Sequence, residues 1–227
     1  MPNCPLPPVR DAYGALRRVV NALAVCGALI WAPAAALAEP TIIALGDSLT
    51  AGYGLAQDDS FPAQLERYLA AAGHEVKIVN AGVSGDTTAG GRARLAWTLA
   101  EPADLVIVEL GANDGLRGID PAETRRNLDA ILTELGRRGI AVLLTGMLAP
   151  PNLGGAYGAD FNALFPELAR KHDVMLYPFF LEGVAARPDL NQADGIHPNA
   201  AGVGIIVDRI GPYVIELLTA IKQARAS

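Results

Sequence analysis

The sequence predicts a three-layer α/β domain in which a five-stranded parallel sheet lies between two layers of helices. Short apolar runs alternate along the chain with longer segments of helical periodicity, and this alternation is typical of a parallel sheet covered on both faces. Two of the runs, LVIVEL and IAVLL, are apolar at nearly every position, as strands buried on both faces should be. No linker divides these elements into two groups, so we expect one domain.

The elements follow in order from about residue 40. The predicted strands are Thr41 to Leu45, Val76 to Val79, Leu105 to Leu110, Ile140 to Thr145 and Val174 to Tyr177. The predicted helices are Phe61 to Ala72, Thr87 to Leu99, Pro121 to Arg138, Ala159 to Lys171 and about Ala200 to Gln223. In such sheets the ligand site lies beyond the carboxyl ends of the strands, and we expect chemistry there.

Residues 1–38 have the three parts of a secretory signal peptide. They are a basic start (Arg10, Arg17, Arg18), a mostly apolar segment from Val19 to Trp31, and the small-residue cleavage site Ala36-Leu37-Ala38. A membrane-spanning helix needs about 20 apolar residues, and Pro33 follows this segment closely. We therefore predict a cleaved signal peptide over 1–38, a folded domain over 39–227, export to the periplasm or medium, and no stable membrane anchor.

Charge and cysteine usage narrow the function of the exported part. Without residues 1–38, the chain has 15 basic against 23 acidic side chains, a net charge of about −8. This acidic balance does not favour a nucleic acid as partner. Both cysteines, Cys4 and Cys26, precede the folded domain, which therefore has neither a disulfide nor a thiol nucleophile.

Four polar motifs are expected to meet at one edge of the sheet. GDSL follows the first predicted strand, NAGVSGDTT the second and ELGANDG the third, while DGIHP precedes the last helix. Acyl transfer through a serine needs a nucleophile, a base, a group that orients the base, and donors for the oxyanion. The four motifs contain residues of each type.

The base is identified among three histidines. His74 and His172 lie in ordinary exposed contexts, whereas His197 lies in a loop bounded by glycine and proline, three residues after Asp194. This spacing allows the carboxylate to accept from Nδ1 and leaves Nε2 free to face Ser48. The alternative is a turn in which the aspartate only caps the backbone.

Candidate oxyanion donors are the backbone N–H of Ser48, the backbone N–H of Gly85, which has no Cβ to obstruct a substrate, and the side-chain amide of Asn113. Removal of one such donor typically costs about 2.7–4 kcal/mol in the transition state. The alternative for Asn113 is a turn residue in the left-handed conformation.

Two other kinds of site fit less well. The G-x-S-x-G motif requires glycine two residues after the serine, where this chain has Thr50. Asp47, Asp86, Asp114 and His197 lack any recognisable metal-ligand spacing, and each aspartate can serve as a turn or cap residue. We therefore expect no metal.

Two loops are expected to border the cleft, because they follow the third and fourth strands: Gly115 to Asp120 and Gly146 to Gly158. Their apolar side chains are candidates for contact with an acyl chain: Leu116, Met147, Leu148, Leu153 and Tyr157. The alternative is that these segments are ordinary glycine- and proline-rich connections.

The four motifs, in this order, resemble the blocks of the SGNH or GDSL hydrolases, and VELGANDGLRG, YPFFLEGV and DGIHPN are most similar to the exported bacterial thioesterase I, lysophospholipase and arylesterase type. The resemblance implies a flavodoxin-like fold, no cofactor, and hydrolysis of aryl esters, lysophospholipids and acyl thioesters through an acyl-enzyme. It also implies that Ser48 is the nucleophile, Gly85 and Asn113 are oxyanion donors, and Asp194 and His197 complete the triad.

Two other functions remain open. A carbohydrate O-acetylesterase would use the same triad with a small acyl pocket and exposed aromatic side chains, but the only tryptophan after residue 38 is Trp97, within a predicted helix. A non-catalytic binding domain would be expected to lack the serine or the histidine, and both are present. We expect a monomer whose partner is a small ester or thioester with an acyl chain.

Overall fold

The computed structural model describes Met1 and residues 39–226, with the side chain of residue 226 excluded, so the predicted signal peptide lies outside the described residues. Five strands form one parallel sheet: β1 (Thr41–Gly46), β2 (Lys77–Gly82), β3 (Leu105–Glu109), β4 (Ala141–Thr145) and β5 (Met175–Tyr177). Their spatial order is β2-β1-β3-β4-β5, which is the order of flavodoxin-like sheets. The predicted fold class is confirmed.

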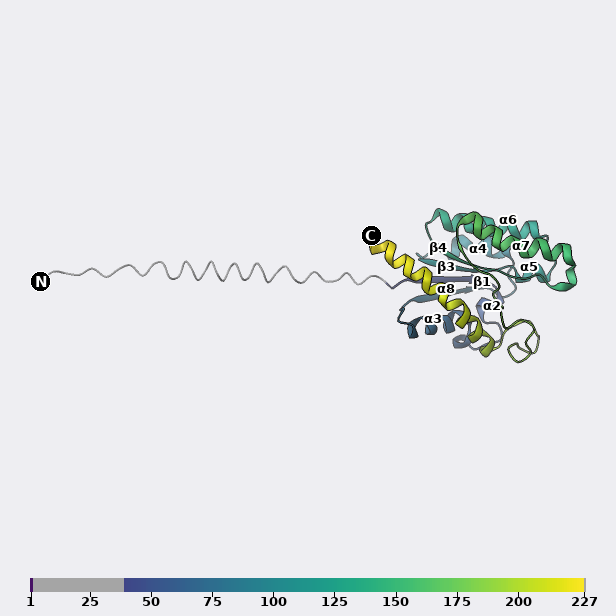
Figure 1. Cartoon of the computed structure of the whole chain (residues 1–227), viewed down its shortest axis with the longest axis horizontal. Helices are drawn as coiled ribbons and strands as arrows, with labels where there is room; N and C mark the ends of the chain where they lie inside the picture. The colour runs from purple at the N-terminus through teal and green to yellow at the C-terminus, as the bar shows by residue number, and fades with distance from the viewer. Residues whose placement is uncertain (2–38, 227) are drawn as a thin grey trace. The chain divides into compact units, whose positions relative to one another are not determined.

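Helices cover both faces of the sheet (Figure 1). On one face α3 (Phe61–Ala71) packs against α8 (Ala200–Ala226), and on the other α6 (Pro121–Arg137) lies between α4 (Thr88–Thr98) and α7 (Gly155–His172). The sequence of α6 explains its orientation, because Leu128, Ile131, Leu132 and Leu135 are buried at the helical spacing that forms a single apolar stripe.

The strands β1, β2 and β3 end at the same level. Gly46, the last residue of β1, pairs with Gly82 of β2 on one side and with Glu109 of β3 on the other. All five residues of β3 are buried, whereas β2 forms an edge and is largely exposed. The segments that leave β1, β2 and β3 therefore emerge side by side at the carboxyl edge.

Two short helices at this edge were not predicted. They are α2 (Ser48–Ala51) and α5 (Ala112–Leu116), and each is too short to show a helical period in the sequence. The side chain of Asp47 caps α2 by accepting the backbone N–H of Leu49. Ser48 is thus the first residue of a helical turn.

Helix α7 begins at Gly155, four residues before the predicted start at Ala159. Glycines at 154, 155 and 158 conceal this turn in the sequence, because glycine disfavours helix. The ring of Tyr157 stacks on Phe161 with centroids 5.8 Å apart, and its hydroxyl donates to the Ile119 carbonyl. These contacts stabilise a turn that local propensity does not favour.

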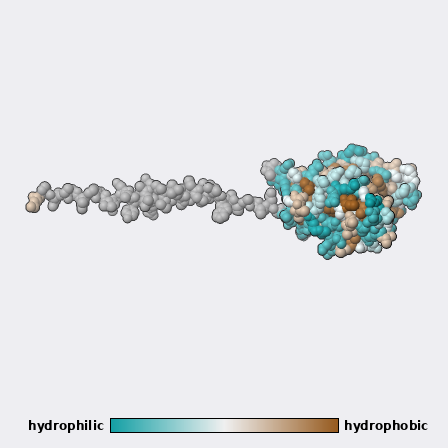
Figure 2. Space-filling view, turned by 60° about the horizontal axis from the view of Figure 1, so that its bottom comes forward, coloured by the Kyte–Doolittle hydropathy of each residue, from teal (hydrophilic) through white to brown (hydrophobic). Residues whose placement is uncertain are grey.

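The surface of the described residues carries both hydrophilic and apolar side chains. On the face that Figure 2 shows, hydrophilic residues predominate and apolar residues form small separate patches. Within residues 39–226, none of the helices combines the length and apolar character needed to span a membrane.

The C-terminal end of α7 suggests a stabilising substitution. Asp173 adopts the left-handed conformation (φ 51°) beyond the last turn of α7, whereas α3 is followed at the equivalent place by Gly73 (φ 83°). A non-glycine residue pays about 1–2 kcal/mol for this conformation, and a carboxylate is also unfavourable near a helix C-terminus. We expect Asp173→Gly to raise the free energy of unfolding by about 1 kcal/mol, measured by urea denaturation.

The matched variant is Gly73→Asp, which places the same carboxylate in the same conformation after α3. No other atom obstructs a Cβ at this position, so any loss of stability comes from the backbone conformation and the charge. Equal stability of Asp173→Gly and the natural protein would contradict this account.

Candidate active site

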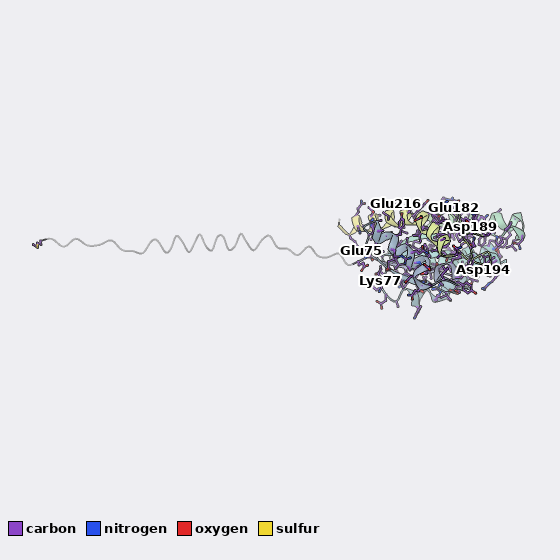
Figure 3. All side chains as sticks on the ribbon, turned by 90° about the horizontal axis from the view of Figure 1, so that it is seen from below. Glu75, Lys77, Glu182, Asp189, Asp194 and Glu216 are labelled. Atoms are coloured by element: carbon purple, nitrogen blue, oxygen red, sulfur yellow. The ribbon has the colours of Figure 1, made fainter. Side chains whose placement is uncertain are left out.

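The four polar motifs meet at the carboxyl edge of the sheet. Figure 3 shows Asp194 at the end of the domain opposite Lys77, the residue that begins β2. Ser48 and Asn113 lie in the short helices that follow β1 and β3, and Gly85 lies in the loop after β2. His197 lies just before α8. The predicted residues of all four motifs are therefore gathered at one end of the domain.

Ser48, His197 and Asp194 form a continuous chain of hydrogen bonds. Ser48 Oγ is 2.9 Å from His197 Nε2, and His197 Nδ1 is 2.7 Å from Asp194 Oδ2. A carboxylate can only accept a hydrogen bond, so Asp194 places the ring proton on Nδ1 and leaves the Nε2 lone pair facing the serine hydroxyl.

Asp194 is held as a carboxylate by its surroundings. Its Oδ1 accepts the backbone N–H groups of His197 and Ile196, each at 3.0 Å. The hydrogen bond from the His197 backbone, together with that from the His197 ring, lowers the pKa of Asp194 to about 2. The orienting charge is thus present at any pH at which the domain is expected to work.

Among the candidate oxyanion donors, the amide of Asn113 has hydrogen-bond partners of its own. Its Nδ2 donates to the backbone carbonyl of Asp86 at 2.9 Å and to Asp47 Oδ2 at 3.1 Å. Both amide hydrogens are therefore engaged, and a substrate oxygen can be bound only if one of them is shared or released. Gly85 adopts a left-handed conformation (φ 83°), and its carbonyl accepts from Arg117.

An arginine that sequence analysis did not identify ties the first two motifs together. Arg94 of α4 forms an ion pair with Asp86 at 2.6 Å and donates from Nη2 to the carbonyl of Gly46 at 2.8 Å. The Arg94 side chain, 17% exposed, thus fixes the end of β1 relative to the loop that contains Gly85. The sequence signal that could have identified Arg94 is its position on the helix that directly follows SGDTT.

Asp114 ties the second motif to the third. Its Oδ2 accepts the backbone N–H of Thr88 at 2.9 Å, and its Oδ1 accepts the hydroxyls of Thr88 and Thr124. Asp47, Asp86 and Asp114 therefore each have structural partners, and no group of three potential metal-ligating side chains is found among the residues that the structure describes.

A pair of buried carboxyl groups lies beneath Ser48. Asp47 and Glu109 are both fully buried, and Glu109 Oε2 accepts the Thr50 hydroxyl at 2.8 Å and the Asp47 backbone N–H at 3.3 Å. Burial raises the pKa of Glu109 well above its usual range, and the neighbouring Asp47 carboxylate adds to this effect. Burial also raises the pKa of Asp47 to about 6, against hydrogen bonds from Leu49 and Asn113 that lower it. Glu109 is accordingly the member that keeps its proton.

An apolar cavity of about 370 Å³ opens beside Ser48 and His197. Its apolar lining comes from the segments after β1, β3, β4 and β5, and consists of Leu49, Ala112, Leu116, Met147, Leu148, Ala149, Pro150, Pro151, Phe179, Leu181, Ala185, Ala186 and Ile196. Ser48, Asn113, Asn191 and His197 contribute the polar side chains. The reacting groups thus lie on the wall of an apolar cavity.

The structure brings three of the five predicted acyl-contact residues into this cavity, namely Leu116, Met147 and Leu148. Leu153 and Tyr157 are not part of the lining, which corrects the expectation from their loop. Tyr157 instead packs on Phe161 and bonds to the Ile119 carbonyl, and Leu153 lies beside Gly118. The sequence could not separate these roles because all five side chains are apolar and lie in cleft-side loops.

The segment after β5 contributes lining residues that sequence analysis did not identify, among them Phe179, Leu181 and Ile196. The run YPFFLEGV contains the first two, and its density of apolar and aromatic side chains after a strand was the available signal.

The fold and the site define a class of protein: three-layer α/β proteins with a serine–histidine–aspartate arrangement at the carboxyl edge of a parallel sheet, as in serine hydrolases. The chain belongs to the GDSL-like Lipase/Acylhydrolase family, whose profile matches residues 44–205. The matched range includes all four polar motifs.

The chain is similar to several characterised relatives. Esterase TesA of Pseudomonas aeruginosa is 41% identical over 198 residues, which cover 86% of this chain and 98% of TesA. Thioesterase 1/protease 1/lysophospholipase L1 of Escherichia coli K12 is 41% identical over 174 residues, covering 76% and 82%. The crystal structure of AlinE4, an SGNH-hydrolase family esterase, is 52% identical with a TM-score of 0.67, covering 79% of this chain and 97% of AlinE4.

The buried acid pair predicts how stability changes with pH. An acid whose pKa is raised by folding keeps a proton that the unfolded chain releases, so stability falls as the pH rises above the unfolded value. We expect the natural protein to lose stability between pH 4.5 and 8 through Glu109 and Asp47, and Glu109→Gln to reduce that loss. Urea denaturation at the two pH values measures the difference.

Asp194 does not obscure this effect, because its lowered pKa keeps it ionised throughout that range. Asp129→Asn is the control, since hydrogen bonds from Lys171 and His172 lower the pKa of Asp129. An unchanged pH dependence in Glu109→Gln would show that Glu109 is ionised in the folded protein.

Proposed function

We propose that this chain hydrolyses carboxylic esters and acyl thioesters through an acyl-enzyme formed on Ser48. The observation that carries the proposal is the chain of hydrogen bonds from Asp194 through His197 to Ser48, at 2.7 and 2.9 Å, on the wall of an apolar cavity. Membership of a lipase and acylhydrolase family supports it, as do the relatives named as an esterase and as a thioesterase and lysophospholipase.

In the first step Ser48 Oγ attacks the carbonyl carbon of the substrate while His197 Nε2 takes the hydroxyl proton. The carbonyl oxygen becomes negative and accepts hydrogen bonds from the backbone N–H groups of Ser48 and Gly85 and from the amide of Asn113. Asn113 then shares the hydrogen that Asp47 accepts at 3.1 Å, the longer of its two bonds. The imidazolium returns its proton to the leaving alcohol or thiol.

In the second step water attacks the acyl carbon, and His197 accepts one of its protons. Collapse of the second oxyanion breaks the bond to Ser48 Oγ, which regains a proton from His197, and the free acid leaves. Asp194 remains a carboxylate throughout, and its role is to orient the ring and stabilise its charged form. No metal or cofactor takes part in either step.

The cavity indicates the substrate class. Its apolar side chains can bury a hydrocarbon chain whose carbonyl lies at Ser48, which fits aryl esters, lysophospholipids and acyl thioesters with an acyl chain of several carbons. A carbohydrate O-acetylesterase is less favoured, because among the described residues only Phe179 adds an aromatic ring to His197 in the cavity lining, and a sugar ring would need more surface for stacking.

The proposal includes export and a monomeric state. The predicted signal peptide over residues 1–38, with cleavage near Ala38, would place the folded domain in the periplasm or medium. Residues of a single chain supply the serine, the base and the orienting carboxylate, so activity requires no second copy.

The nucleophile is tested with Ser48→Ala. Loss of Oγ removes the acyl-enzyme, and we expect kcat/KM on p-nitrophenyl butyrate to fall by at least about 10³-fold. A fluorophosphonate probe should label the natural protein and not the variant. Ser60→Ala, at a serine whose hydroxyl donates to the carbonyl of Gln57 in the turn before α3, should label as the natural protein does.

Wild-type turnover by a correctly folded Ser48→Ala protein, checked by circular dichroism, would refute the mechanism. Absence of both labelling and turnover in the natural protein would instead indicate a binding domain on this fold.

The acyl chain is tested with p-nitrophenyl esters from acetate to dodecanoate. Each buried methylene is worth about 0.8 kcal/mol, or about fourfold, so kcat/KM should rise from acetate until the chain outgrows the cavity. Ala185→Trp, which adds a large side chain at the lining, should move the maximum to shorter chains. Ala220→Trp, at an exposed position of α8, is the control. A maximum at acetate would favour the O-acetylesterase.

A further inference from the structure

Tyr53 packs against the imidazole of His197. The two ring centroids are 4.7 Å apart and the planes are inclined by 37°. Tyr53 is 53% exposed and is not part of the cavity lining. Neither burial in the core nor contact with the acyl chain therefore explains why a large aromatic side chain occupies this position.

The backbone of Tyr53 is connected to both parts of the site. Its N–H donates to the carbonyl of Ser48 at 3.1 Å, directly after the helical turn that begins with the serine. Its carbonyl accepts from Gln192 Nε2 at 2.7 Å. The position of the ring is therefore determined by the serine turn on one side and by the histidine loop on the other.

Gln192 fixes that second connection. Its side chain also donates to the carbonyl of Pro198 at 3.0 Å, and its backbone N–H donates to the carbonyl of His197 at 2.8 Å. These bonds hold the segment around His197 against the loop that bears Tyr53. The contact between the rings is thus part of a built arrangement and does not depend on the rotamer of Tyr53 alone.

Other groups occupy both nitrogen edges of the His197 ring, so Tyr53 can act on the ring only by packing against it. Asp194 meets the Nδ1 edge of the ring and Ser48 meets the Nε2 edge, while the Asp47 carboxyl acts on it from beneath the serine turn. Both edges are occupied, and Tyr53 packs against the ring by its own aromatic surface.

We propose that Tyr53 is a positioning residue for His197, holding the imidazole between Asp194 and Ser48 and favouring its charged form through the aromatic face. This inference rests on the proposed hydrolytic function, in which His197 becomes an imidazolium twice per turnover. The face of an aromatic ring carries negative electrostatic potential and attracts a nearby cation. The ring also limits rotation of the imidazole away from Ser48 Oγ.

The variants Tyr53→Leu and Tyr53→Phe separate this role from a merely structural one. Leucine fills space but has no aromatic face, so the charged imidazole loses stabilisation. The acidic limb of the pH profile of kcat/KM should therefore move to lower pH, by about half a pH unit for a contact of ordinary strength.

The rate is expected to change together with the pH profile. At the pH-independent maximum, kcat of Tyr53→Leu should fall about 3- to 10-fold with KM nearly unchanged, because Tyr53 supports the base and does not line the cavity. Tyr53→Phe should retain the pH profile and, within about twofold, kcat. Trp97→Leu, which removes an aromatic side chain that is 80% exposed on α4, should match the natural protein.

The possible outcomes are distinct. An unchanged pH profile and an unchanged kcat in Tyr53→Leu would overturn the inference, and so would a rise in KM alone, which would make Tyr53 a substrate contact. Equal losses in Tyr53→Phe and Tyr53→Leu would also overturn it, because they would assign the effect to the hydroxyl. A natural protein that neither hydrolyses esters nor labels with fluorophosphonate would refute the proposed function instead.

Discussion

The in-register parallel pairing of β1 with both β2 and β3 is the constraint on which the site depends. Because Gly46 lies level with Gly82 and Glu109, the three chain segments that leave these strands emerge at one height. Ser48 and Asn113 belong to two of these segments and Gly85 to the third. A shift in either pairing would move one of them along the strand direction by about 3.3 Å per residue, which exceeds the tolerance of a hydrogen-bonded site.

This convergence has an electrostatic cost that the structure offsets locally. Asp47, Glu109 and Asp114 are buried at the carboxyl edge, where an unpaired charge is unfavourable. Three hydrogen bonds from two threonines stabilise the Asp114 carboxylate, and Glu109 keeps its proton. The same groups connect the motifs, so the polar interior that surrounds the serine also sets the spacing between its loops.

The histidine reaches the site by a different route. A segment with little regular structure connects β5 to α8, and its end carries Asp194 and His197. This segment is not a strand of the sheet: Phe180, Val184 and Leu190 anchor it in the core, and hydrogen bonds such as that from Gln192 to the carbonyl of Tyr53 hold it beside the serine turn. The nucleophile and the candidate oxyanion donors thus follow strands directly, whereas the base is positioned by packing and hydrogen bonds of a connecting segment.

The amino-acid sequence by itself determined the strands, the five long helices and the set of residues able to perform acyl transfer. Strand runs such as LVIVEL are apolar at nearly every position, and only one of the three histidines has a carboxylate three residues before it, so local patterns carry this information. The sequence did not predict the start of α7 or the short helices α2 and α5, because glycines and short length leave no helical period to detect.

The tertiary structure alone decided several contacts at the site. Glu109 lies beneath Ser48, Arg94 joins β1 to the loop of Gly85, and Tyr53 packs on His197. Leu153 and Tyr157 lie outside the cavity. These are contacts between residues far apart in the chain, and their distances depend on how strands and helices pack, which no local pattern records.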